Sequence, residues 1–440
     1  MVCEGDKYPL GRNAYYYVKA EADDGFGEQA DDYTAADAFR PLSVGMEFEQ
    51  GREFTETAQA GRARSQDNVI AGKFACTWNM ECYAETHQSG SAAQSPDIAP
   101  FIKAAVGTSA NNGDGVADGK FLPASSGNCL NSLNIIRTVP NAYSEQLIGA
   151  AVDSMTISAS GGDPIKFAFS RRAYNRIQTG YAKSNGDNSG TASPQTLQPF
   201  APITDIYQYT VGARQADGTT TAGSLVMWTT GSGSGTGNQM KATAYADEDA
   251  GTLTVGTGKA GNASGDTYLA PWYPTGGVTL NGKPLTSITG GVTITPFKVD
   301  GSTLHTGSGT QITDAPITSL ELTVENNIQG IEDECFDPSS FSGFVPGFRD
   351  VSGTITMRVK TDVGSLILAR RDLYRLNKMV ITLGDVANEK IQITLGKTEW
   401  DPSSIEVSGQ DEMTVSVPFK AFATDATLAN QNTDIEIEYI

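Results

Sequence analysis

The sequence is poor in the side chains on which metal and covalent chemistry depend. It has only two histidines, His87 and His305, and its five cysteines include no CxxC pair. A zinc site needs closely spaced Cys and His ligands, so none is expected. No nucleophile motif is present either. We therefore expect neither enzymatic activity nor a cofactor.

Long apolar runs and an excess of positive charge are also missing. No stretch approaches the roughly 18 apolar residues of a membrane helix, and the N-terminal MVCEGDKYPLGRN lacks the pattern of a signal peptide. The formal net charge is −20, which argues against a surface that grips nucleic acid phosphates but not against a wall past which DNA slides. We expect a soluble protein, without a membrane partner, made in a cytoplasm with reduced thiols.

The sequence is rich in glycine and in stretches where apolar and polar residues alternate. It has 48 Gly, 39% hydrophobic and 19% charged residues, a composition typical of a β-dominated globular protein. Apolar and polar residues alternate in several stretches, which predicts strands with one buried face. These stretches are FACTWNMECY, SLNIIRTV, VDSMTISAS, PIKFAFSRRAY, ITSLELTV, VSGTITMRVK, EKIQITLGKTEW and DEMTVSVPFKAF.

Two short helices are expected among these strands. One is SPDIAPFIKAAVG, with Ser95 as its N-cap and Gly107 as its stop. The other is Gly364–Asn377, which has no period of two. Each helix falls within one of two blocks of strands, so the predicted fold is mainly β in the α+β class.

The expected domain organisation follows the same layout. It comprises an N-terminal arm (1–35), a first half (36–175), a Gly-rich all-β insertion that projects from the surface (176–312), and a second half (313–440). The two halves repeat in layout and not in letters, since each has a strand, a short helix with its connection, and several alternating strands.

Two acidic stretches are candidate sites. Asn112, Asp114 and Asp118 have spacing that resembles part of a calcium loop, but the first and last ligands of such a loop are absent, and an Asn/Gly turn is the alternative. Glu332–Glu334 could form paired carboxylates for acid–base work, or a solvated edge. The basic doublet Arg171–Arg172 is expected to form salt bridges or a subunit contact.

Several of these stretches resemble a known family. SLNIIRTVPNAYSEQLIGAAVDSMTISASGGDPIKFAFSRRAY, ITSLELTVENNIQGIEDE, VSGTITMRVK, KMVITLGD, EKIQITLGKTEW, VSVPFKAFATD and DIEIEYI look like the core of siphophage major tail tube proteins. The resemblance covers roughly residues 10–172 and 313–440. The Gly-rich insertion departs from the compact form of that family.

The resemblance implies two β-sandwich halves of the tail tube type, each with a flanking helix. In that family, subunits form rings whose inner sheets make one β-barrel, and the rings stack through loops and arms into a conduit for DNA ejection. The implied partners are further copies of the chain, the tape measure protein, and the tail terminator and distal tail or baseplate proteins. DNA would be present only in transit. The implied location is the phage tail of a virion assembled in a bacterial cytoplasm.

Two loops are expected to make ring-to-ring contacts. They are residues 51–68 and 326–350, which precede corresponding strands of the two halves. The candidate contact residues are Glu56, Arg62, Arg64, Glu332, Asp333 and Glu334. Because the halves repeat, rings of three chains are preferred over rings of six.

A different class of function remains open. A capsid-decorating or receptor- or glycan-binding β-protein would explain the Gly-rich insertion, with Trp228, Trp272 and Tyr273 as a sugar platform. A glycosidase would need Glu332 and a second acid in one cleft, and we expect no sugar cleavage.

Overall fold

The computed structural model describes residues 14–21, 26–27, 37–54, 69–89, 92–111, 119–123, 130–139, 143–177, 181–184, 194–198, 225–228, 239–242, 244–247, 252–254, 267–269, 282–298, 303–305, 311–313, 316–332, 335, 340–359, 376–386, 389–400, 413–423 and 434–440. The chain forms two compact units. The smaller unit comprises Met1–Arg40, Asn134–Ile148 and Asn175–Leu280, and the main unit comprises Pro41–Leu133, Gly149–Tyr174 and Asn281–Ile440.

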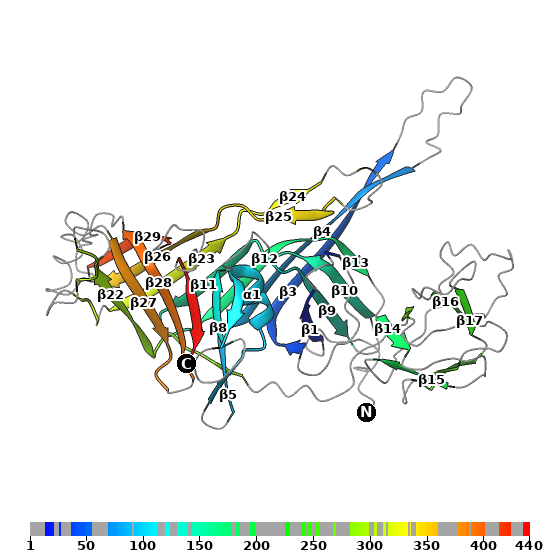
Figure 1. Ribbon diagram of the computed structural model, residues 1–440, viewed down its shortest axis with the longest axis horizontal. Helices are drawn as coiled ribbons and strands as arrows, with labels where there is room; N and C mark the ends of the chain where they lie inside the picture. Colours follow the sequence, from blue (N-terminus) through cyan, green and yellow to red (C-terminus); the bar gives the residue numbers. More distant parts are fainter. Residues whose placement is uncertain are drawn as a thin grey trace, which may run out of the picture. The chain divides into compact units, whose positions relative to one another are not determined.

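Both units are built from antiparallel strands, which confirms the mainly-β prediction (Figure 1). The one helix among the described residues is α1 (Ala99–Val106) in the main unit. Its apolar stripe is buried as expected, and it ends at Gly107, whose φ of 134° suits glycine. The predicted N-cap, Ser95, is wrong. A turn in which the Ala99 amide donates to Pro96 O precedes the helix, so Ile98 takes the cap position.

The smaller unit holds one well-packed sheet in the order β13-β10-β9-β1-β2. Its strands are β1 (Tyr15–Ala20), β2 (Ala38–Phe39), β9 (Leu133–Val139), β10 (Tyr143–Ala150) and β13 (Asn175–Ile177). Two further sheets contain β14 (Tyr181–Ser184), β15 (Pro194–Gln198), β16 (Leu225–Trp228), β17 (Gln239–Ala242), β18 (Ala244–Asp247), β19 (Thr252–Thr254) and β20 (Thr267–Leu269). Residues 15–20 therefore lie in a sheet of their own chain, with Tyr17 and Val18 buried, whereas the sequence suggests an arm.

The main unit is organised by a 13-stranded sheet. Its strand order begins β3-β4-β12-β11-β23-β26-β29-β28 and continues through β30 (Glu436–Tyr439) and two further strands. The strands before β30 are β3 (Pro41–Phe54), β4 (Val69–Tyr83), β12 (Lys166–Ala173), β11 (Ser154–Ser160), β23 (Ile317–Glu325), β26 (Asp350–Arg358), β29 (Thr414–Phe422) and β28 (Ile391–Trp400). We call β3, β4, β12 and β11 the first half-sheet, and β23, β26, β29 and β28 the second half-sheet.

The two half-sheets have the same strand order. In each, the leading strand is followed by the second strand of that half-sheet along the chain, then by the later and finally by the earlier member of an antiparallel pair. β11 pairs with β23 from Ser154↔Glu325 to Ser160↔Ser319, so the last strand of one half-sheet meets the first strand of the other. We call this pairing the joint.

β28 also belongs to a second branch of the sheet. It pairs with β27 (Leu376–Leu383), which pairs with β22 (Gly290–Pro296). It pairs as well with β30 (Glu436–Tyr439), which leads to β8 (Lys120–Pro123) and β7 (Gly107–Ala110). The remaining strands are β5 (Glu85–Ser89), β6 (Ala92–Gln94), β21 (Lys283–Pro284), β24 (Gln329–Ile331) and β25 (Gly343–Val345).

The strand alternation predicted from the sequence sets the core. At the joint, Met155 lies opposite Val324 and Ile157 opposite Leu322, and all four side chains are buried. The apolar face is thus continuous from one half-sheet to the other across the joint.

Parts of the expected insertion and of the second expected helix form strands in the structure. VTITPF was expected in the insertion, yet its residues form most of β22, which pairs with β27 in the main unit. Of the second expected helix, Leu376 and Asn377 lie in β27, and the rest lies outside the described residues. The domain boundaries themselves stay predictions.

Candidate functional site

The face opposite the core is polar on both half-sheets. At the joint, Thr156 lies opposite Thr323 with their hydroxyl oxygens 3.3 Å apart, and Ser158 lies opposite Glu321. Following the register outward, the same face carries half-buried or exposed Glu47, Thr77, Asn79, Glu81, Ser352, Thr354, Thr356, Ser416 and Lys420. We call this surface the polar face.

Carboxylates outnumber cations on the polar face. Lys166 Nζ lies 2.7 Å from Glu81 Oε1, and Lys420 Nζ lies 2.6 Å from Asp350 Oδ2. The hydrogen bond to Glu81 raises the pKa of the Lys166 ammonium above its ordinary value. The charged members of the face are Glu47, Glu49, Glu81, Glu321, Glu325, Asp350 and Glu399, against Lys166, Arg172, Arg358, Lys397 and Lys420.

A short hairpin, β24–β25, lies beyond the C-terminal end of β23 (Figure 1). It places apolar side chains in solvent: Ile331 is 40% exposed, Val345 51%, and Phe348, just after the hairpin, 95%. Beneath them, Phe341 is fully buried and stacks on Phe344 with ring centroids 6.2 Å apart. We call Ile331, Val345 and Phe348 the apolar tip.

The base of this hairpin is held by the joint. The Ile328 amide donates to Asp153 Oδ1 at 2.7 Å, and Arg171, paired with Asp153 Oδ2 at 2.9 Å, donates to Ile328 O. Asn326 is buried, and its Nδ2 donates to the carbonyls of Ala105 (2.9 Å) in α1 and Val152 (3.1 Å) before β11. The hairpin therefore starts from a fixed position at the end of the first half-sheet.

The flank of the hairpin is tied to β4 and β12. Lys73 Nζ donates to Glu332 O at 2.7 Å, and Arg172 forms an ion pair with the Glu332 carboxylate. Asn327, with a φ of 47°, donates from Nδ2 to Phe348 O at 2.8 Å. These contacts orient the backbone that carries the apolar tip.

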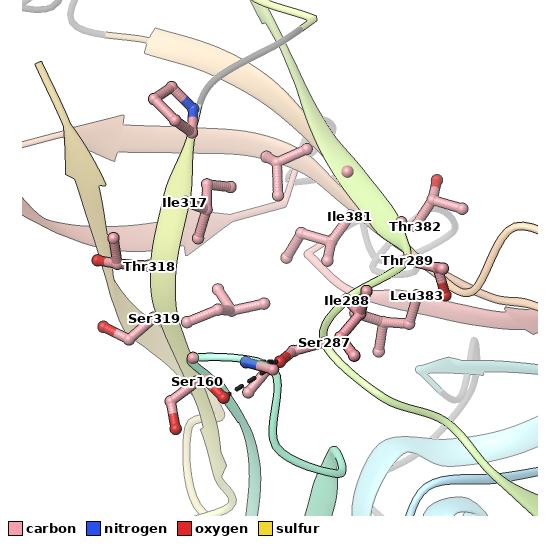
Figure 2. A pocket seen from close by; sticks show the side chains of 18 of the residues that line it. Ser160, Ser287, Ile288, Thr289, Ile317, Thr318, Ser319, Ile381, Thr382 and Leu383 are labelled. Carbon is pink, nitrogen blue, oxygen red and sulfur yellow. Dashed lines mark hydrogen bonds between the residues drawn. The ribbon is translucent and has the colours of Figure 1, made fainter. Parts of the chain in front are cut away.

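A cavity of about 540 Å³ lies at the opposite ends of the same strands (Figure 2). It is lined by the β11–β12 turn, the start of β23, the end of β26, β27, β22 and the segment before β22. Ser287 closes one side, since its hydroxyl donates to Ser160 O at 3.1 Å and accepts from the Gly162 amide at 2.8 Å. Ile288 at the rim is 76% exposed, and a Cβ at Gly291 would meet no atom within 4 Å.

Of the expected ring-contact residues, only Glu332 is described. It lies beside the apolar tip and forms an ion pair with Arg172. Glu56, Arg62, Arg64, Asp333 and Glu334 lie outside the described residues. The prediction that the Arg171–Arg172 doublet forms salt bridges is confirmed.

The other candidates are described in part or not at all. Asn112, Asp114, Asp118, Trp272 and Tyr273 lie outside the described residues, and Trp228 ends β16. In the part of the chain that the structure describes, no cluster of His, Cys, Asp or Glu has the grouping of a metal site. Cys76 and Cys82 are buried thiols, as expected, whereas the Cys335 thiol is exposed.

The apolar tip and the cavity were both missed by sequence reasoning. β24 and β25 have three residues each, too few for a periodic signal. The available signal for the tip was Phe348, which stands among turn-forming and polar residues at the end of SGFVPGFRD.

No family model matches this chain, and no curated protein matches it either. Among the described residues, no helix has the length and hydropathy of a membrane span.

Proposed function

We propose that this chain is a structural protein that assembles with copies of itself into rings and stacked tubes, as siphophage tail tube proteins do. The observation that carries the proposal is the repeated strand order of the two half-sheets together with the joint between them. Within one chain, the joint is an example of a leading strand that is covered by a strand of another half-sheet.

The edge available for that contact is β3. Along its described length, β3 pairs with β4, and no other described strand pairs with the opposite edge of this 14-residue strand. Long open edges attract other strands unless they are covered. β23, the leading strand of the second half-sheet, is covered by β11. A strand of a neighbouring copy would cover β3, but that strand would not be β28, the counterpart of β11, because β27, β29 and β30 already pair with both edges of β28.

This geometry favours a small ring. Each chain contributes two half-sheets of equal order, so three chains would supply six half-sheets. We propose trimeric rings, with hexamers as the alternative. In a closed ring, the second edge of every β3 strand would be paired.

The polar face suits the inner wall of such a ring. Hydroxyls interact weakly with passing phosphates, and the excess of carboxylates repels them, so DNA would move through without adhering. The tape measure protein would occupy the lumen before ejection, and the tail terminator and distal tail or baseplate proteins would close the two ends in the virion.

Negative-stain electron microscopy of the concentrated protein tests the proposal. Hollow tubes or stacked rings are expected, and end-on views would count the chains. A chain that stays monomeric at high concentration would overturn it. Deleting Glu56–Arg64 is expected to prevent tube growth, as the ring-contact prediction for that loop requires.

A further inference from the structure

We infer that the apolar tip of one copy inserts Phe348 into the cavity beside Gly291 of a second copy, so that copies stack head to tail. The inference deepens the proposed function and rests on it, because it names the residues through which one ring would hold the next.

The apolar tip is built for contact. Phe348 is 95% exposed and is flanked by Val345 and Ile331, both at least 40% exposed. Exposed apolar groups clustered on a soluble protein mark contact surfaces. Asn327 holds the Phe348 carbonyl, and Arg349 donates to Asp434 Oδ2 at 2.9 Å and to Val106 O. Little backbone freedom would therefore be lost on binding.

The cavity has the volume and chemistry to receive the tip. Its 540 Å³ lies within the range of pockets that hold small molecules, so a phenyl ring and a neighbouring aliphatic group fit. Aliphatic side chains of Ile288, Val292 and Leu320 line it, and hydroxyls of Ser160, Ser287, Thr318 and Ser319 surround them. These hydroxyls can form hydrogen bonds with the exposed backbone of the inserted hairpin.

The placement of the two features excludes a symmetric pair. The tip follows the C-terminal end of β23 at Glu325, and the cavity includes the N-terminal end at Ile317, so the two features lie at opposite ends of a nine-residue strand. That is about 30 Å of strand. A protrusion at one end and its receptor at the other form a heterologous contact, which repeats without closing when successive copies are displaced along the strand direction. Such a contact generates a stack.

The contact is too small to act alone. A buried phenylalanine contributes about 150–250 Å², whereas a stable pair buries about 1,600 Å². Insertion would hold two copies together only where several tips engage at once, as between rings. We therefore expect stacking to depend on ring formation.

Two variants separate the tip from its receptor. Phe348→Asp removes the tip, and its fold should be unaffected because the side chain is exposed. Gly291→Leu fills the cavity from a position with open space around its Cβ. Tyr15→Asp, at an exposed aromatic of 41% in the smaller unit, is the matched control. Phe348→Ala is the milder variant, and should raise the concentration needed for stacking at least about tenfold.

Electron microscopy and sedimentation velocity give the readout. Phe348→Asp and Gly291→Leu should each form single rings, and Tyr15→Asp should form tubes. A mixture of the first two should give double rings and nothing longer, since one supplies only cavities and the other only tips. Tubes formed by Phe348→Asp, or a mixture that stays as single rings, would overturn the inference alone. Wild-type protein that forms no rings would overturn the proposed function.

Discussion

The two half-sheets share a strand order but not a core. The first buries aromatic and sulfur-containing side chains, whereas the second buries mostly aliphatic ones. The contrasting sets are Cys76, Trp78, Met80, Cys82, Phe167 and Phe169 against Leu320, Leu322, Val324, Ile355, Val415 and Val417. The polar face, by contrast, has the same hydroxyl-rich and acidic character on both.

The difference follows from what each core packs against. Phe101 of α1 lies 6.0 Å from Trp78 and 5.4 Å from Phe169 between ring centroids. Large rings and flexible sulfur-containing chains fill the irregular space beside a helix, while β-branched and aliphatic side chains fit a pleated surface. The buried side chains of each half-sheet therefore suit the element that packs against them. A wall built from both half-sheets, by contrast, requires the same kind of polar face on each.

Among the substitutions that test this comparison of the half-sheets, one at the joint should cause the largest loss of stability. Leu322→Asp would place a charge at a fully buried position opposite Ile157. We expect a loss of at least about 4 kcal/mol in unfolding free energy, because the carboxylate has no partner there. Denaturant unfolding monitored by fluorescence and circular dichroism measures the loss.

The same experiment tests whether the half-sheets unfold together. Trp78 and Trp400 are buried, one in each half-sheet, so tryptophan-to-phenylalanine variants identify each signal. One shared transition is expected. Two separate transitions in Leu322→Asp would mean that the half-sheets are independent. Glu321→Ser, one residue away on the polar face, is the control and should change little.

Asn326 links the second half-sheet to the helix under the first. Asn326→Ala leaves the carbonyls of Ala105 and Val152 without that donor, and we expect a cost of about 2–3 kcal/mol. Thr323→Ala, which removes a half-buried hydroxyl pair with Thr156, should cost less than about 1 kcal/mol. Equal costs for the two variants would contradict a special role for Asn326.

Alkaline pH should distinguish the sulfur-containing core from the aliphatic one. Burial raises the pKa of the Cys82 thiol above its ordinary value of 9.0, with the Glu85 and Glu81 charges adding to the shift. The folded state keeps the thiol protonated while the unfolded chain ionises, so this stability is fully present below pH 9 and is lost above it. By about pH 10 the loss relative to neutral pH is about 1.4 kcal/mol.

Cys82→Ala removes this dependence. Its unfolding free energy should be lower at neutral pH, because a cavity is left, but it should fall less between neutral pH and pH 10 than that of the wild type. Denaturant unfolding in reducing buffer across this range gives the comparison. Parallel pH curves for the two proteins would contradict the assignment to Cys82.

Local patterns in the sequence predicted the strands because burial and alternation are properties of neighbouring residues. FACTWNMECY became a strand with Cys76, Trp78, Met80 and Cys82 buried, and Gly161–Gly162 became the turn between β11 and β12. Gly107 ended its helix. In each case the signal and the structure lie within about ten residues.

Long-range placement was not predictable in the same way. The cavity draws on segments from Ala159 to Leu383, and no local period specifies which strand ends meet. β22 pairs with β27 about 90 residues later, so its sequence alone suggested membership of the Gly-rich insertion. Arg171 occupies a core-face position of β12, and only its contacts with Asp153 and Ile328 explain a charge there.

The smallest effect is expected where the half-sheets are most alike. Each has a lysine on the third strand of its order that reaches an acid on the second strand: Lys166 with Glu81, and Lys420 with Asp350. Both pairs lie on the polar face and are partly exposed, and such pairs contribute little because solvent screens them. Lys166→Met and Lys420→Met should therefore leave the unfolding midpoint unchanged within error.

Both substitutions also remove a cation from the proposed wall. Tubes of the double variant should therefore form normally and bind less of a fluorescent polyanion than wild-type tubes. Stronger binding would mean that this face is not the surface that the polyanion meets.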